Sequence, residues 1–355
     1  MIRNQWYTVL ESNEVPRHTP LSVTRMGERL VFWRNSGGAV TCMHDICPHR
    51  RVALSLGRIV GDCLECPFHG FQYDGVGRCR LIPANGKGAP IPQAIRLDTY
   101  PTHEAHGLIA IWWGEPRDPV PAPPHFEALD ESFSYVTVRD RWATHYSRAI
   151  ENQLDVVHLP FLHKTTIGRG GRTLVNGPLV RWETHAFERD RLNLWLKNEV
   201  DTGQRPLRPE EMLEPNRHPG LQFQFPNLWH NWINDTVRVF AAFAPIDDAN
   251  TQMYVRFYQS FVRTPVLRDL VNLAAWPFNL LILRQDKATV QTHVPGPSDL
   301  RGGEKLIQGD LPIIEFRRRR AELLRGQSAI PEGDTDGPNM AVAGPSTAWL
   351  GATPG

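Results

Sequence analysis

The sequence from residue 47 to residue 70 reads CPHRRVALSLGRIVGDCLECPFHG and contains the motifs Cys47-Pro-His49 and Cys66-Pro-Phe-His69, with sixteen residues between them. Each motif supplies one thiolate and one imidazole, and its proline restricts the backbone beside the cysteine. A Rieske [2Fe-2S] cluster uses this ligand set, because two cysteines hold one iron and two neutral histidines hold the other. The spacing therefore predicts an iron–sulfur cluster and a chain that handles electrons.

Two other chemistries use the same residue types. Two cysteines and two histidines also bind structural zinc, but zinc fingers pair Cys with Cys and His with His, whereas each motif here mixes the two. Cys63 and Cys66 form a Cys-x-x-Cys pair, which is typical of thioredoxin-like sites when a βαβ pattern surrounds it. The sequence shows no such pattern there, and the iron–sulfur interpretation is favoured over both alternatives.

Size and charge are those of an ordinary globular protein. The chain has 355 residues, of which 41% are hydrophobic, and this is enough to form the cores of two domains. The formal net charge of +1 gives no bulk attraction to nucleic acid or to an anionic membrane, so we expect neither as a partner. The basic run at residues 317–320 is predicted to be a solvated helix face.

The distribution of cysteines and apolar residues indicates where the protein resides. All five cysteines lie in the first 80 residues, which suits a cofactor site better than a disulfide framework. The N-terminus lacks the apolar core of a signal peptide. The most apolar stretch, residues 270–283, is shorter than the roughly 20 residues of a membrane span and is predicted to be a buried helix. We therefore expect a cytoplasmic protein.

The chain is predicted to be α+β, with two domains. Short β-type runs separated by turns indicate an all-β domain at residues 1–115, and a proline-rich linker follows at residues 116–126. The catalytic domain is predicted at residues 127–326 and a loosely ordered tail at residues 327–355. Within the catalytic domain, strands are expected at residues 179–187, 192–200, 236–244 and 251–261, and helices at residues 147–158, 265–293 and 311–325.

A second metal site is predicted from the segment that ends at His163. Glu151, Asp155 and His158 lie at positions i, i+4 and i+7, which share one face of a helix. Because Pro160 disfavours a continuous helix, the chain can turn and bring His163 towards His158. Two histidines and one carboxylate form the facial triad of non-haem Fe(II) oxygenases.

The third ligand of this site has to come from another part of the chain. Asp286 is the preferred candidate, because it lies in an otherwise apolar helical stripe, where an acidic side chain is costly to bury unless it binds something. An ion-paired structural role for Asp286 stays open. Asp247 and Asp248 are competing candidates, but they lie in a predicted hairpin turn and are expected to be solvated.

These residues resemble the Rieske non-haem iron oxygenases, specifically the catalytic α subunits of the group that contains vanillate O-demethylase, the methylxanthine N-demethylases and pheophorbide a oxygenase. The resemblance covers most of the chain up to Gln327. Its motifs are Trp6-Tyr7, Cys47-Pro-His-Arg50, Leu54-Ser-Leu-Gly57, Cys66-Pro-Phe-His-Gly70, Tyr73-Asp74, Gly107-Leu-Ile109, the segment from Glu151-Asn152 to His163, and Gln285-Asp286. Arg51 and Val52 stand where relatives usually have Gly-Ala.

The resemblance implies a role for each site residue and a helix-grip catalytic domain. Cys47 and Cys66 would bind one iron of the cluster, and His49 and His69 the other. The mononuclear iron would be held by His158, His163 and Asp286. Asp155 would link an iron-bound histidine to His69 of the next subunit as an electron conduit, which implies a head-to-tail homotrimer. Glu151 and Asn152 belong to the same motif and are predicted, with Asp155, to be catalytic residues.

The resemblance also implies the function of a terminal oxygenase. Oxygen activation needs electrons, and because the sequence has no convincing nicotinamide or flavin fingerprint, a separate reductase or ferredoxin is expected. The predicted reaction is monooxygenation by O2 of an aromatic or polycyclic organic substrate, either hydroxylation or removal of O- or N-methyl groups. Ring cis-dihydroxylation, a pure Rieske electron carrier and a structural zinc protein are the alternatives. Six aromatic residues are expected either to line a substrate chamber or to form core, namely Phe223, Phe225, Trp229, Trp232, Phe240 and Phe243.

Overall fold

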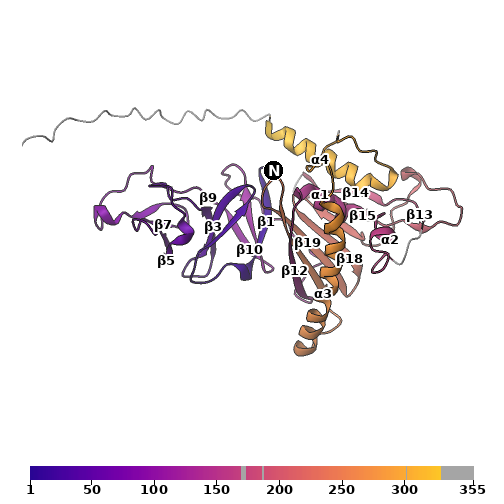
Figure 1. Cartoon of the computed structure of the whole chain (residues 1–355), viewed down its shortest axis with the longest axis horizontal. Coiled ribbons are helices and arrows are strands. Elements are labelled where there is room, and N and C mark those ends of the chain that lie inside the picture. Colours follow the sequence, from indigo (N-terminus) through magenta and orange to yellow (C-terminus); the bar gives the residue numbers. More distant parts are fainter. Residues whose placement is uncertain (169–172, 186–187, 301, 329–355) are drawn as a thin grey trace, which may run out of the picture.

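The computed structural model describes residues 1–168, 173–185, 188–300 and 302–328 (Figure 1). The predicted tail at 327–355 lies outside these residues from position 329 onwards. Within these residues, the N-terminal part of the chain is built from strands and three short 3-10 helices, and a large sheet with four α-helices follows it. The structure therefore confirms the predicted α+β class, with an all-β domain first and an antiparallel catalytic sheet second.

The N-terminal domain consists of three small antiparallel sheets. Their strand orders are β1-β11-β10, β2-β3-β4-β9 and β5-β6-β7-β8. The strands are β1 (Gln5–Glu11), β2 (Leu21–Arg25), β3 (Glu28–Arg34), β4 (Val40–His44), β5 (Arg58–Val60), β6 (Cys63–Glu65), β7 (Gln72–Asp74), β8 (Cys79–Leu81), β9 (Thr99–Tyr100), β10 (Thr102–Ala105) and β11 (Leu108–Trp113). The third sheet is a short meander. The first Cys-His motif lies in the segment that leads from β4 to β5, and the second lies in the connection between β6 and β7.

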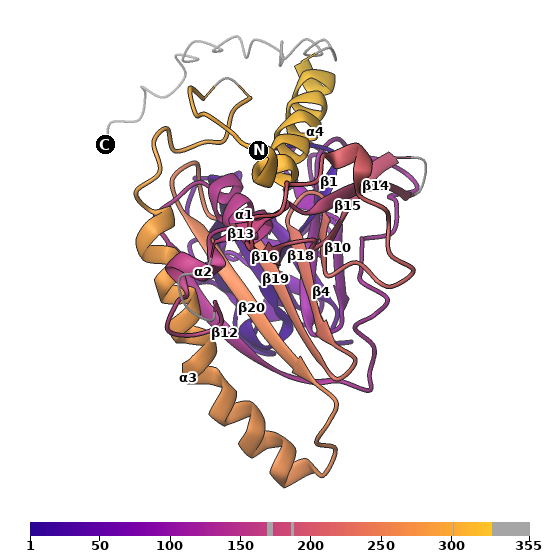
Figure 2. The ribbon, with the colours of Figure 1, turned by 90° about the vertical axis from the view of Figure 1, so that its right-hand side faces the viewer.

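The catalytic domain is built on one seven-stranded antiparallel sheet. Its order is β12 (Ser134–Trp142), β20 (Thr251–Gln259), β19 (Val237–Pro245), β18 (Leu228–Asn234), β17 (Leu221–Gln224), β15 (Glu188–Trp195) and β14 (Leu179–His185). A two-stranded sheet pairs β13 (Leu174–Val175) with β16 (Glu199–Val200). The helices are α1 (Tyr146–Leu154), α2 (Leu159–Leu162), α3 (Pro265–Val290) and α4 (Leu311–Ser328). The long helix α3 runs along the sheet on the face turned away from the N-terminal domain (Figure 2).

Polar contacts fix the two domains to each other. The side chain of Asn227 donates to the carbonyl of Thr8 at 2.8 Å and accepts from its amide at 3.3 Å. The buried carboxylate of Glu11 accepts from Arg256 at 2.8 Å and from Arg139 at 2.6 Å. Apolar residues of β1 and of the large sheet belong to one continuous core. Strand β1 of the N-terminal domain is therefore packed firmly against the catalytic sheet.

Three expectations about the elements are wrong in detail. The helix expected at residues 147–158 ends at Leu154, so Asp155 and His158 lie beyond its last turn. The strand expected at 192–200 is two strands, because β15 ends at Trp195 and β16 begins at Glu199. Residues 270–283 do form a helix, but most of it is exposed, since only 11% of the most apolar window of α3 is buried.

The basic run at residues 317–320 is not a solvated face either. Arg317 is buried, with 4% of its surface exposed, and it forms ion pairs with Glu151 and Glu304. Arg318 is the exposed member of the run. The pattern of charges near Arg317 in the sequence does not predict this arrangement, because the two carboxylates that pair with Arg317 belong to other segments of the chain.

Candidate cluster loops and metal centre

The two Cys-His motifs lie in loops of the same conformation. In the first loop, the amide of Cys47 donates to the carbonyl of Val52 at 2.8 Å, and the amide of Arg51 donates to the carbonyl of Cys47 at 2.9 Å. In the second loop, Cys66 and Phe71 are joined at 2.8 Å, and the amide of Gly70 donates to the carbonyl of Cys66 at 3.1 Å. Each loop therefore turns back on itself five residues after its cysteine.

Each turn places its fourth residue after the cysteine in the left-handed region of backbone space. Gly70 adopts φ +71° at this position, and Arg51 adopts φ +61° at the equivalent one. A glycine does this without steric cost, whereas a residue with a side chain pays about 1–2 kcal/mol. Arg51 is thus a strained residue beside the first motif, in the position where the resemblance leads one to expect glycine.

The four motif residues form a buried cysteine pair and an exposed histidine pair. Cys47 and Cys66 are 1% and 2% exposed, while His49 and His69 lie at the surface with ring centroids 4.6 Å apart. The ring of His49 stacks on Phe71, and the thiol of Cys47 lies 3.3 Å from the hydroxyl of Tyr73. Burial raises the pKa of the Cys66 thiol, so a bound metal is needed to keep it as a thiolate at neutral pH.

The geometry of these residues fits a two-iron cluster and not a single zinc ion. The donors of a tetrahedral zinc site lie within about 4 Å of one another. Among the described residues, the only group of three or more such ligands whose atoms all lie within 4.8 Å is His158, His163 and Asp286. The cysteines and histidines of the two motifs therefore do not converge on one point. The pKa of Cys63 is raised by burial, which is the opposite of a thioredoxin-like thiol.

The second predicted metal site is brought together by two helices, α2 and α3. His158 precedes α2, His163 follows it, and Asp286 lies in the last two turns of α3. The Nε2 atom of His163 lies 2.9 Å from Oδ1 of Asp286, and Nε2 of His158 lies 3.6 Å from the same oxygen. The structure thus joins the two histidines to Asp286 and not to Asp247, whose carboxylate accepts from Ala249 and Asn250 in the β19–β20 turn.

Neighbouring polar groups lie beside both imidazoles, and one of them forms a hydrogen bond with His163. The Nδ1 atom of His163 lies 2.8 Å from Oε1 of Gln285, which can only accept, so this nitrogen carries the hydrogen and Nε2 is left to face the centre. On the other ring, Oδ2 of Asp155 lies 3.6 Å from Nδ1 of His158. Asp155 is itself held as the residue that ends α1, because its Oδ1 accepts from the amides of Val157 and His158.

The charges of the site are strongly coupled. Burial alone would lower the pKa of His158, but the carboxylates of Asp155 and Asp286 outweigh burial and raise its pKa to about 9. Burial would raise the pKa of Asp286, yet the two imidazoles lower it to about 2. In the metal-free protein the site therefore holds an ionised carboxylate beside protonated imidazole, and a cation can replace those protons.

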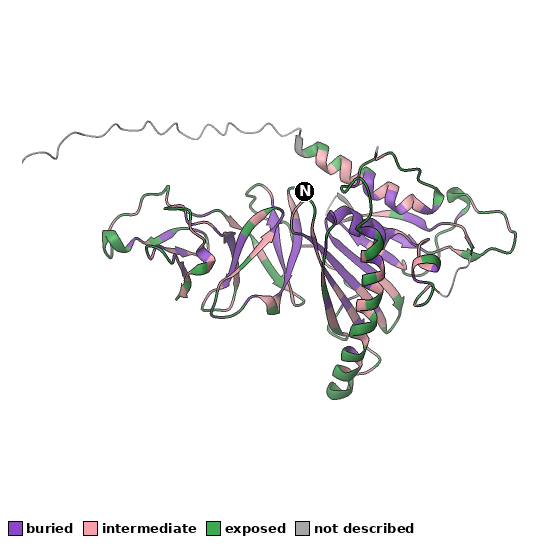
Figure 3. Cartoon of the chain, viewed as in Figure 1, coloured by how far each residue is buried: buried purple, intermediate pink, exposed green. Residues whose placement is uncertain are grey.

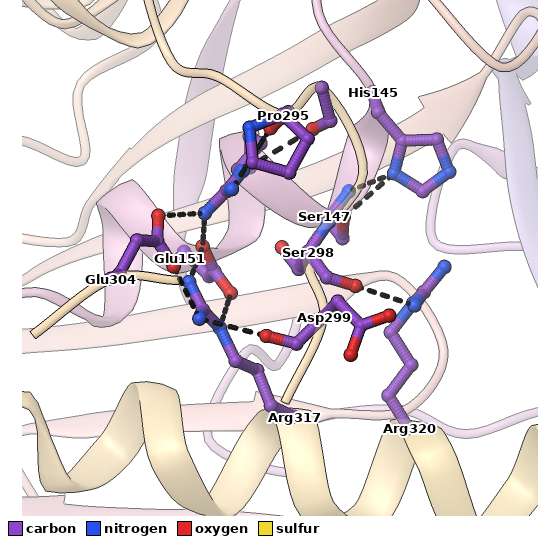
Figure 4. Close-up of polar contacts among 11 residues, drawn as sticks. His145, Ser147, Glu151, Pro295, Ser298, Asp299, Glu304, Arg317 and Arg320 are labelled. Atoms are coloured by element: carbon purple, nitrogen blue, oxygen red, sulfur yellow. Dashed lines mark hydrogen bonds and ion pairs between the residues drawn. The ribbon is translucent and has the colours of Figure 1, made fainter. Parts of the chain in front are cut away.

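Glu151 and Asn152 do not join the three ligands. The carboxylate of Glu151 accepts from Arg317 at 2.6 Å (Figure 4). It also accepts from Arg148 at 2.8 Å. The same two arginines reach Glu304 and the backbone of residues 295–299. This buried network anchors α1, and with it Asp155, to α4. The side-chain amide nitrogen of Asn152 is buried and has no hydrogen-bond partner among the described residues.

An apolar cavity of about 300 Å³ opens beside the three ligands, between α3 and the large sheet. Sheet residues such as Trp229, Val239 and Phe257 form one wall, and Phe278, Ile282 and Leu283 of α3 form another. Its charged lining residues are those of the metal site, and its other polar ones are the amides of Asn152, Gln153, Asn231 and Asn279. The cavity is thus shaped for an uncharged molecule.

Only one of the six aromatic candidates lines this cavity. That residue is Trp229. Phe223, Phe225, Phe240 and Phe243 are core residues, and Trp232 stacks on His218. The sequence did not predict that the carboxamides of Gln153 and Asn231 line the cavity, because single amide residues form no motif of recognisable spacing. The ion pair between Arg148 and Glu151 has the i, i+3 spacing that could have revealed it.

The cluster loops and the candidate metal centre lie near opposite ends of the folded molecule. Figure 1 shows β5 and β7, which belong to the sheet that carries the second motif, at one end of the molecule, and α2, which joins the two histidines, near the other. The rest of the N-terminal domain and part of the catalytic sheet lie between them. Electron transfer between the two sites within one chain would have to cross this distance.

The comparisons with known proteins agree with this architecture. Residues 5–101 match the Rieske [2Fe-2S] domain, and residues 142–326 match the vanillate O-demethylase oxygenase C-terminal domain. The chain is 28% identical over 338 residues to the methylxanthine N1-demethylase NdmA of Pseudomonas putida, covering 91% of this chain and 89% of that protein. The oxygenase component of dicamba O-demethylase from Stenotrophomonas maltophilia is 33% identical over 165 residues, which cover 46% of this chain and 48% of that protein.

Solved structures share the fold along nearly the whole chain. The structure of NdmA from Pseudomonas putida superposes with a TM-score of 0.72 at 24% identity, covering 92% of both chains. Dicamba monooxygenase bound to dicamba gives a TM-score of 0.68 at 19% identity and covers 93% of this chain and 99% of that one. Several other relatives match over less of their length, such as the chloroplastic protein TIC 55 of Arabidopsis thaliana, of which 30% is covered.

A small cluster-binding β domain joined to this catalytic sheet defines a Rieske non-haem iron oxygenase. The chain belongs to the vanillate O-demethylase oxygenase family of that class. It is an oxidoreductase, its cofactors are a Rieske [2Fe-2S] cluster and a mononuclear iron, and it works with a separate electron donor on a small organic substrate.

Proposed function

We propose that this chain is a monooxygenase for an uncharged aromatic or polycyclic compound, which it hydroxylates or from which it removes an O- or N-methyl group. The observation that carries the proposal is the position of the apolar cavity beside His158, His163 and Asp286. A substrate in this cavity would have its reacting carbon next to the metal and would be shielded from water. Relatives named for N-demethylation and O-demethylation support the same reaction type.

In this proposal His158, His163 and Asp286 hold the mononuclear iron. When bound, the metal supplies open coordination positions and one-electron chemistry for the activation of O2. Gln285 keeps the free lone pair of His163 directed at the centre, and Asp155 does the same for His158. Asn152, with its unpaired amide nitrogen in the cavity wall, is proposed to donate a hydrogen bond to the substrate.

The electrons would reach this site from a neighbouring subunit. Cys47 and Cys66 would hold one iron of the cluster, and the exposed His49 and His69 the other. The separation of the two sites within one chain supports transfer between chains (Figure 1), with Asp155 as the conduit to the neighbour's His69. A head-to-tail ring satisfies this requirement for every subunit, and we propose a homotrimer.

The domain limits and the location of the protein are part of the same proposal. We assign residues 1–115 to the Rieske domain, 116–126 to the linker and 127–326 to the catalytic domain. The linker segment contains neither helix nor strand, which supports these limits. All five cysteines are free of disulfides, and we propose that the enzyme works in the reducing cytoplasm.

Metal analysis combined with a turnover assay tests the proposal. The purified protein should contain about three irons and two acid-labile sulfides per chain. The reduced enzyme should oxidise its cluster in a single turnover only when O2 and an uncharged aromatic compound are both present. A preference for carboxylated or sulfonated substrates would contradict the assignment of the cavity.

A further inference from the structure

The N-terminal half of α3 is an apolar helix that the rest of the chain leaves uncovered. It projects past the end of the large sheet in both views and is coloured as exposed along its projecting part (Figures 2 and 3). Leu270 is 57% exposed and Leu273 is 68% exposed. The other exposed large side chains of this half are Val266, Leu267, Trp276, Phe278 and Leu281.

The exposed apolar side chains cover a wider part of the circumference of this helix than a single packed partner helix would bury. At 100° per residue, the exposed side chains from Trp276 round to Phe278 span about 200° of the circumference. The remaining side is turned to β12, where the buried Asn272 donates to the hydroxyl of Ser134 at 3.4 Å. A partner helix covers a narrower stripe than this, whereas the apolar interior of a lipid layer surrounds an inserted helix.

We propose that residues 266–281 of α3 insert into the surface of an anionic lipid bilayer. The charges beside this segment fit phosphate headgroups, because Arg263 and Arg284 are exposed beyond its two ends, while Asp269, the acidic residue within it, is paired with Arg268 at 2.9 Å. Long arginine side chains can keep their guanidinium groups among the headgroups while the leucines enter the acyl layer. Trp276 is of the residue type that prefers the headgroup level.

The second half of α3 limits how deep the helix can enter. The helix has the length and composition of a membrane span, but Leu283, Asp286 and Val290 are buried against the catalytic domain. Asp286 is moreover tied to both histidines of the candidate metal site. The helix therefore cannot leave the domain to cross a bilayer, and the proposed contact is with one lipid leaflet.

This contact would place the active-site cavity next to the lipid. Phe278 is exposed on the helix and also lines the cavity, as do the adjacent Asn279 and, one turn later, Ile282. An uncharged apolar compound dissolved in the bilayer could pass along α3 into the cavity without crossing water. This last step rests on the proposed function, whereas lipid binding itself does not.

Sedimentation of the full-length protein with vesicles tests the proposal. Vesicles of phosphatidylcholine with about 30% phosphatidylglycerol should bind the wild-type protein, and vesicles of phosphatidylcholine alone should bind it more weakly. The variant Leu273→Glu should lose at least about tenfold in affinity, since it replaces a leucine that would enter the acyl layer with a charged side chain. Leu213→Glu makes the same substitution at a residue that is 81% exposed outside α3 and should bind as wild type does.

A second readout measures directly whether α3 enters the lipid. Brominated lipids should quench part of the wild-type tryptophan fluorescence, and Trp276→Phe should remove that part. Absence of vesicle binding by the wild-type protein would overturn the proposal. So would a change in particle mass of Leu273→Glu in lipid-free buffer, because it would make this face a contact between copies of the chain. Oxygenase activity enters neither readout.

Discussion

Binding of the mononuclear iron should release protons, and the pH dependence of iron affinity measures this directly. In the metal-free protein the pKa of His158 is about 9, because Asp155 and Asp286 outweigh the effect of burial. At pH 7 about 99% of the molecules therefore carry a proton on the imidazole that has to bind the metal. Displacing this proton costs about 2.7 kcal/mol at pH 7, which corresponds to roughly a hundredfold in affinity.

The affinity of the mononuclear site for Fe(II) should increase with pH and then reach a plateau. The affinity for Fe(II) should rise by at least about tenfold per pH unit between pH 7 and pH 9 and then level off, since the competing proton is gone above the pKa of His158. The pKa of His163 is also raised, because its hydrogen bonds to Asp286 and Gln285 outweigh burial, and this second imidazole can only make the rise steeper. Anaerobic titration calorimetry in buffers with different ionisation heats counts the released protons. The cluster should first be loaded, so that only the mononuclear site is titrated.

The variant Asp155→Asn tests whether His158 is the group that causes the pH dependence of iron affinity. Asp155→Asn removes one of the two carboxylates that raise the pKa of His158. The plateau of the affinity curve should therefore move to lower pH in this variant, with the cluster absorption unchanged. An iron affinity that does not depend on pH, or that falls as pH rises from 7 to 9, would refute the reasoning.

Three further predictions concern single side chains. Asp286→Ala should lose the mononuclear iron while the visible absorption of the cluster stays intact, and retention of that iron by metal analysis would move the ligand role to another acid. Asp155→Ala should keep both centres but nearly abolish single-turnover oxidation of the cluster in stopped flow; a normal rate would remove the conduit role. Arg317→Ala should destabilise the fold by about 3–5 kcal/mol, because Glu151 loses a buried partner, whereas Arg318→Ala should cost less than about 0.5 kcal/mol in denaturant unfolding. Equal costs for the two arginine variants would show that the buried network is unimportant for stability.

The metal-binding residues were predictable because their chemistry is local in sequence. The Cys-His motifs lie within single loops, and His158 and His163 lie on either side of one short helix. Asp286 could be found because an acidic residue in an apolar helical stripe is costly to bury without a partner. The structure brings Asp286 within hydrogen-bonding distance of His163, as the helical periodicity suggested.

What could not be predicted depends on contacts between distant residues. The helix pattern at residues 147–158 does not reveal that α1 ends at Leu154, where the side chain of Asp155 accepts from the following amides. The burial of Arg317 depends on Glu151 and Glu304, which approach it only in the folded chain. The sequence also did not predict that most of α3 is exposed. Its outer face is as apolar as its inner face, and apolar character alone predicts burial.

The most direct test of cooperation between two iron centres in adjoining subunits is a complementation measurement. A His69→Ala chain lacks a working cluster, and an Asp286→Ala chain lacks the mononuclear iron, so each homo-oligomer alone should be inactive. Oligomers assembled from equal amounts of both chains should recover about a quarter of the wild-type single-turnover amplitude, the share of sites in a head-to-tail ring that receive both working centres. Mixed oligomers that remain fully inactive would contradict electron transfer between subunits.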